Sequence, residues 1–126
     1  MNIAIWVIQI LLALAFLAAG FMKATQPIDK LQARMEWVES LNPRTLVRVI
    51  GTLEVLGALG LILPAVTGIL TWLTPLAAAG LALTMIGALL LHASRKDAFS
   101  HFATNVILLA LALIVIYGRV VAVPLT

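Results

Sequence analysis

The sequence predicts an all-α fold: an integral membrane four-helix bundle with an amphipathic interfacial helix between spans 1 and 2. The first observation is composition, since 63% of the 126 residues are hydrophobic and only 10% are charged. Soluble domains have about 45–50% apolar and about 25% charged residues. The second is a mean hydropathy of +1.17. The third is a set of four apolar segments, each near the roughly 20 residues that cross a bilayer as a helix.

The four spans are expected at about residues 3–22, 46–63, 70–91 and 102–119, within one transmembrane domain that covers residues 1–126. The first is expected to be a retained span, because its start has no basic side chain and its apolar stretch exceeds a signal-peptide core. Thr74-Pro75 leaves two alternatives for the third. Its helix either begins near Pro75 or runs from Val66 with a kink.

The connection between the first two spans has helical periodicity of its own. Apolar residues recur at spacings of three or four, and polar residues occupy the other face; the apolar positions are Ile28, Leu31, Met35, Val38 and Leu41. We expect an interfacial helix at about residues 27–41, which ends at Asn42-Pro43 and places Trp37 among lipid head groups. It is either a packed cap on the bundle or a surface that senses lipid or docks a partner.

Charge sets the expected orientation. Seven of the eight basic residues lie in the segments 23–48 and 92–101, and Arg119 alone lies on the other side. The positive-inside rule then places these two loops in the cytoplasm and both termini outside, in the inner (cytoplasmic) membrane. Trp6, Trp72 and Tyr117 fall at the three expected outer ends, as an aromatic belt would. Because the positive charges flank the spans, the net charge of +3 indicates contact with lipid head groups and no nucleic-acid partner.

Each predicted span has a polar residue in its inner half or at its inner end: Lys23, Glu54, His92 and Asn105. Helical side chains tilt toward the N-terminus of their own helix. The first span runs inward and the second runs outward, so Lys23, at the inner end of the first span, points back into the membrane. Glu54 points toward the inner face, and therefore toward Lys23. One interpretation is a polar pocket in which Glu54 carries a proton or accepts a ligand's hydrogen bond, with His92 as a proton relay. The alternative is a buried ion pair, hydrogen-bonded by Asn105, that only fixes helix register.

The remaining patterns restrict the chemistry. With no cysteine and no recognised ligand spacing, no metal site is expected, and the glycines do not follow a nucleotide-binding pattern. Small residues instead form stripes along the spans, typical of close helix packing, and are compatible with a homodimer; they are Ala15, Ala19, Gly51, Gly57, Gly60, Ala79, Gly80 and Gly87.

Two segments carry a resemblance to a known family. AAGFMK at residues 18–23 and GTLEVLGALGLILP at residues 51–64 resemble the DoxX and DoxX-like family of small membrane proteins. The more specific parts of this resemblance are the pairs Gly20/Lys23 and Gly51/Glu54. The resemblance implies four transmembrane helices. The family is named for a subunit associated with an archaeal quinol oxidase and thiosulfate:quinone oxidoreduction, and other relatives are linked to oxidative-stress complexes or membrane-protein assembly.

Three functions follow as hypotheses. The first is an accessory subunit of a membrane complex that binds a quinone, another lipid or a partner protein at Lys23 and Glu54. The second is a quinone-linked oxidoreductase component, so whether the chain takes part in an enzymatic reaction stays open. The third is a small proton-coupled transporter. It ranks lower, because Lys23 is available within the same chain to neutralise Glu54.

Overall fold

The structure, a computed structural model, describes residues 2–41, 45–96 and 99–124. The described residues form helices and no strand: α1 (Asn2–Thr25), α2 (Ile28–Arg34), the 3₁₀ helix η1 (Glu36–Ser40), α3 (Leu46–Thr67), α4 (Leu73–Arg95), α5 (Phe99–Tyr117) and the π-helical turn η2 (Gly118–Ala122). Four of these stretches are long and apolar enough to cross a membrane: α1, α3, α4 and residues 102–122. The predicted all-α membrane bundle is therefore confirmed.

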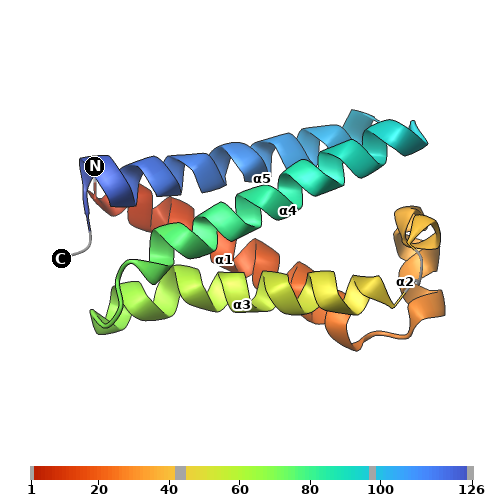
Figure 1. The fold of residues 1–126 in the computed structure, drawn as a ribbon, viewed down its shortest axis with the longest axis horizontal. Helices are drawn as coiled ribbons and strands as arrows, with labels where there is room; N and C mark the ends of the chain where they lie inside the picture. Colours follow the sequence, from red (N-terminus) through yellow and green to blue (C-terminus); the bar gives the residue numbers. More distant parts are fainter. Residues whose placement is uncertain (1, 42–44, 97–98, 125–126) are drawn as a thin grey trace.

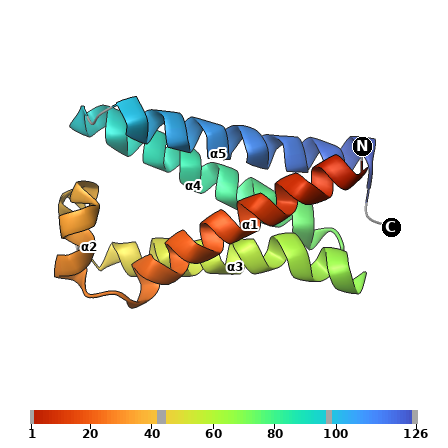
Figure 2. The same cartoon turned by 180° about the vertical axis from the view of Figure 1, so that it is seen from behind.

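The four long helices are arranged as two pairs. Helix α1 packs mainly on α3, and α4 packs mainly on α5, while α3 also contacts α4. The pairs approach each other at the end that holds both termini and spread apart toward the end where α2 and η1 lie (Figures 1 and 2). The polar connection between α1 and α3 thus lies at the wide end of the bundle.

The outer surface of the bundle is apolar. At most 33% of the most apolar window of each span is buried inside the protein, and large side chains such as Ile3, Leu14, Leu83 and Ile107 are exposed. An apolar surface of this extent has to be covered by hydrocarbon. The chain is therefore a multi-pass membrane protein in contact with the lipid bilayer.

The inward faces meet in one core, formed by Leu12, Ala13, Phe16, Ala58, Leu61, Ala78, Leu81, Ala82, Met85, Ala112 and Val115. Pro64, which is buried inside α3, has no N–H to donate to the carbonyl of Gly60. The Thr74 hydroxyl donates to that carbonyl instead, at 3.2 Å. Helix α4 begins at Leu73, near Pro75, and residues 68–72 form a turn outside any helix.

The interfacial segment differs from the single helix expected at residues 27–41. It is broken at Met35, whose φ of −124° and ψ of 87° separate α2 from η1. The break folds η1 back, so that Leu31 and Val38 bury their side chains against Val47 of α3. All five predicted apolar positions belong to this small cluster, together with Met22 and Trp37. The predicted stop at Asn42-Pro43 lies outside the described residues.

Candidate functional site

The site begins where α1 crosses α3, at a pair of glycines. A Cβ atom on Gly20 would lie 2.6 Å from the carbonyl oxygen of Gly51, and one on Gly51 would lie 2.6 Å from the carbonyl oxygen of Gly20. Both distances are too short for a side chain, so only glycine allows the two backbones to come this close. The Cβ atoms of Glu54 and Lys23 lie against these glycines from the opposite helix. The crossing therefore sets the spacing of the two charged residues.

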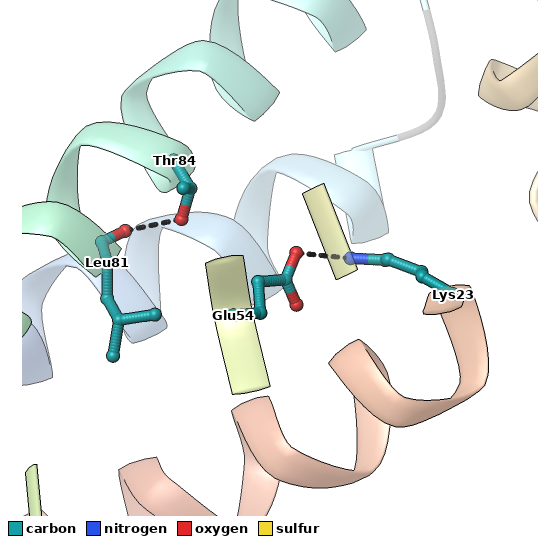
Figure 3. A network of polar contacts seen from close by, with 4 residues as sticks. All are labelled: Lys23, Glu54, Leu81 and Thr84. Atoms are coloured by element: carbon teal, nitrogen blue, oxygen red, sulfur yellow. Dashed lines mark hydrogen bonds and ion pairs between the residues drawn. The ribbon is translucent and has the colours of Figure 1, made fainter. Parts of the chain in front are cut away.

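Lys23 and Glu54 form a direct ion pair. The Lys23 Nζ donates to Glu54 Oε1 at 2.7 Å (Figure 3). The Glu54 side chain is 1% exposed and that of Lys23 is 12% exposed. The Trp37 ring of η1 lies with its centroid 5.5 Å from Nζ, in cation–π geometry. The interfacial segment thus covers the ammonium from the wide end of the bundle.

The second carboxylate oxygen of Glu54 has no such partner. Oε2 is buried, and no donor lies within hydrogen-bond distance of it in the part of the chain that the structure describes. The nearby Thr84 hydroxyl donates to the Leu81 carbonyl of its own helix at 2.7 Å (Figure 3). A buried carboxylate oxygen without a donor is unfavourable unless a ligand, a water molecule or a proton satisfies it.

A cavity of about 580 Å³ lies beside this pair. All four residues singled out from the sequence line it: Lys23, Glu54, His92 and Asn105. The other lining residues are mostly apolar and come from α1, α2, η1, α3, α4 and α5; they include Phe16, Arg34, Trp37, Leu53, Met85, Leu91 and Leu108. The arrangement, a few polar groups on a largely apolar wall, is typical of small-molecule sites.

His92 and Asn105 hold a different position from the ion pair. His92 is buried, and its ring packs on Phe102 with centroids 6.2 Å apart and planes tilted by 59°. Both His92 and Asn105 have interaction partners within the protein. They contribute polar groups to the wall of the cavity, whose charged lining residues in the described chain are Lys23, Glu54 and Arg34 of α2.

The structure also contains a second polar cluster, at the opposite end of the bundle, that sequence reasoning missed. The buried Arg119 donates from Nε to Gln9 Oε1 and from Nη1 to Asn2 Oδ1 at 2.8 Å. Its guanidinium lies over the Trp6 ring, 5.4 Å from the centroid. Gln9 in turn donates to the Leu61 carbonyl at 2.7 Å. The amide of Gln9, in the middle of the first apolar stretch, is the signal from which a buried polar partner could have been predicted.

Four spans around a cavity that contains a buried lysine–glutamate pair define a small polytopic membrane protein with a candidate ligand site. A family model described as the DoxX-like family matches residues 7–115, and the chain belongs to this family. The resemblance found in the segments 18–23 and 51–64 is thereby confirmed. Comparisons with curated proteins and with solved structures gave no match.

Proposed function

We propose that this DoxX-like protein is an accessory subunit of a membrane complex that binds a membrane-soluble quinone in the cavity beside Lys23 and Glu54. The observation that carries the proposal is the buried Glu54 Oε2, which faces no donor within the described chain and belongs to a residue that lines the cavity. A ligand that offers a donor to this oxygen removes the cost of burying it unpaired.

The two redox forms of a quinone each match one half of the pair: the quinol matches Glu54 and the oxidised quinone matches Lys23. A quinol hydroxyl donates to Glu54 Oε2. The Lys23 ammonium has three N–H donors and gives one of them to Oε1, so another can reach a quinone carbonyl. The ring and its substituents would pack on Phe16, Met85 and Leu108. The cavity volume of about 580 Å³ lies within the range of about 300–1,000 Å³ found for small-molecule sites.

The same geometry favours binding over proton transport. A proton carrier has to exchange its proton with both sides of the membrane, whereas Glu54 is held by Lys23 at 2.7 Å within one chain. Because the sequence has no cysteine, thiol and iron–sulfur redox chemistry is absent from this chain. An accessory role, with electron transfer at a bound quinone or in another subunit, therefore fits these residues best.

The test is to purify the protein gently in a lipid-like detergent, record its ultraviolet–visible spectrum and identify the extracted lipids by mass spectrometry. About one quinone per chain is expected in the wild type. Glu54→Gln and Lys23→Met are each expected to lower this content about tenfold, as loss of one charge-assisted hydrogen bond implies. Thr52→Val is the matched control, because Thr52 is exposed on α3 and its hydroxyl bonds to the Arg48 carbonyl.

A wild type that contains only bulk phospholipid would refute quinone binding. Equal quinone content in wild type, Glu54→Gln and Lys23→Met would refute the assignment of the site to the ion pair.

A further inference from the structure

We infer that the tail of the bound ligand leaves the cavity sideways into the bilayer, between α3 and α4, through an opening formed at Gly87. The inference rests on the proposed function and deepens it. It specifies a ligand with a polar head group and a long apolar tail, and it assigns the route by which that ligand reaches Glu54.

The first observation concerns where α3 and α4 are in contact. A Cβ atom on Gly60 would lie 2.8 Å from the Cβ of Ala77, and one on Gly57 would lie 2.7 Å from the Leu81 side chain. These close approaches lie toward the end with the termini. Beyond them the two helices diverge toward the end with α2 (Figure 1). Helices α3 and α4 are therefore in tight contact between Glu54 and the end with the termini, and they separate between Glu54 and the end with α2.

The second observation identifies the opening itself. Leu53 of α3 and Gly87 of α4 line the cavity and are also exposed on the outer surface of the bundle. Leu53 is 52% exposed. A residue that lines a cavity and also faces the bilayer marks a place where the two are continuous. At this level of the spans the surroundings are hydrocarbon, so the opening admits an apolar chain.

The third observation distinguishes this opening from a second one. Ala15 of α1 and Thr104 of α5 also line the cavity and are exposed. Gly87, however, is the one lining residue in the described chain without a side chain, and a Cβ atom placed on it would meet no atom within 4 Å. Leu53 also adjoins Glu54 in α3. Because Gly87 has no side chain and free space lies where one would begin, we assign the route to this opening.

The experiment compares Gly87→Leu with Gly80→Leu. Both glycines are exposed on α4, and a Cβ on either meets no atom within 4 Å, but only Gly87 lines the cavity. Both substitutions replace a poor helix former with a good one, so both variants are expected to fold. The probes are decylubiquinone, which has a tail, and the same quinone without a tail. Binding is read from quenching of Trp37 fluorescence in a Trp6→Phe/Trp72→Phe background, since Trp37 lines the cavity.

Gly87→Leu is expected to weaken decylubiquinone binding about tenfold, the loss that corresponds to about two methylene groups no longer buried. Binding of the tailless quinone to this variant is expected to change less than about threefold, and Gly80→Leu is expected to bind both probes as the wild type does. If Gly87→Leu leaves decylubiquinone binding unchanged, or if Ala15→Leu alone weakens it, the route between α3 and α4 is wrong although quinone binding stands. A wild type that binds neither probe overturns the proposed function and this inference with it.

Discussion

Glu54 is a carboxylate that is 1% exposed inside a membrane span. Its position in the sequence, as the only charge in residues 49–63, predicted that it needs a partner, and the tilt of helical side chains indicated Lys23. The structure places Lys23 Nζ 2.7 Å from Glu54 Oε1 and also brings His92 and Asn105 to the same cavity. Whether the four residues face the same cavity depends on how each helix is rotated about its axis. The spans are nearly all apolar, so no periodicity specifies this rotation, and the sequence alone did not decide it.

The ion pair gives a prediction about stability. Glu54→Gln or Lys23→Met alone is expected to lower the free energy of unfolding by about 3 kcal/mol, because each leaves a buried charge without its counter-charge. The double variant, with neither charge, is expected to lose less than the sum of the two single losses. Detergent-induced unfolding followed by circular dichroism measures the cycle. Strict additivity would mean that the two side chains do not interact in the folded protein.

Arg119 is the residue for which sequence reasoning was least adequate. Its partner Gln9 lies 110 positions away in the chain, and no local pattern connects two residues at that separation. Assignment of Arg119 to an outer flank, among lipid head groups, treated it as a solvated charge. Its side chain is instead buried, with hydrogen bonds to Gln9, Asn2 and the Val123 carbonyl.

Arg119→Met is expected to destabilise the protein by about 1–3 kcal/mol, since it removes those bonds and leaves Gln9 Oε1 buried without a donor. Arg119→Met combined with Gln9→Leu is expected to recover part of this loss. Thermal unfolding of the wild type and of these two variants is the measurement. An unchanged midpoint for Arg119→Met would show that this cluster does not contribute to the stability of the fold.

At the level of elements, the crossing of α1 and α3 explains why the pairs Gly20/Lys23 and Gly51/Glu54 share one spacing. Each glycine allows the close approach, and each charged residue three positions later reaches across it. The stripes of small residues predicted close packing from the sequence. The partner helix and the point of contact depend on the tertiary fold, and the stripes carry no information about either.

Gly20→Ala and Gly51→Ala are each expected to force the helices apart, because the added methyl would lie 2.6 Å from a backbone oxygen that has little freedom to move. We expect a loss of about 1–3 kcal/mol in the free energy of unfolding for each, as for other overpacked positions. Gly80→Ala is the control. Its methyl meets no atom within 4 Å, and alanine favours a helix by about 1 kcal/mol over glycine. If all three variants are equally stable, the crossing is not as close as the structure has it.

The interfacial segment shows where periodicity stops being informative. Spacings of three and four predicted one helix at residues 27–41, and the apolar residues of that pattern do pack together. The break at Met35 comes from the tertiary fold, since a straight helix would not bring Val38 to Val47 and Trp37 to Lys23 together. An ion pair, Arg95 Nη1 to Glu39 Oε1 at 3.3 Å, links η1 to the end of α4. Glu39 is 56% exposed, so the pair contributes little.

For the molecule as a whole, hydropathy was sufficient to predict the four spans. A segment that crosses a bilayer as a helix has to be long and apolar, and the chain has four such segments in its described residues. The sequence predicted a polar pocket as one of two interpretations, but the volume of the cavity and its apolar lining could not be derived from it. The cavity arises because the two helix pairs diverge toward the end with α2 (Figure 1), and that divergence is a property of packing between helices far apart in the chain.

Orientation remains a prediction, and the absence of cysteine makes it simple to test. Ile69 and Lys30 are exposed at opposite ends of the bundle. If loops 23–48 and 92–101 are cytoplasmic, a membrane-impermeant maleimide labels the Ile69→Cys variant in intact cells and labels Lys30→Cys only after lysis. The reverse pattern would place both termini in the cytoplasm.

The proposed function and the proposed ligand route both require that the cavity beside Lys23 and Glu54 binds one amphiphilic molecule. Native mass spectrometry of the protein released from detergent tests it most directly. We predict a species with one quinone-sized adduct per chain in the wild type and in Thr52→Val, and the bare chain in Glu54→Gln/Lys23→Met. A bare wild-type chain, or the same adduct on the double variant, would refute ligand binding at the ion pair.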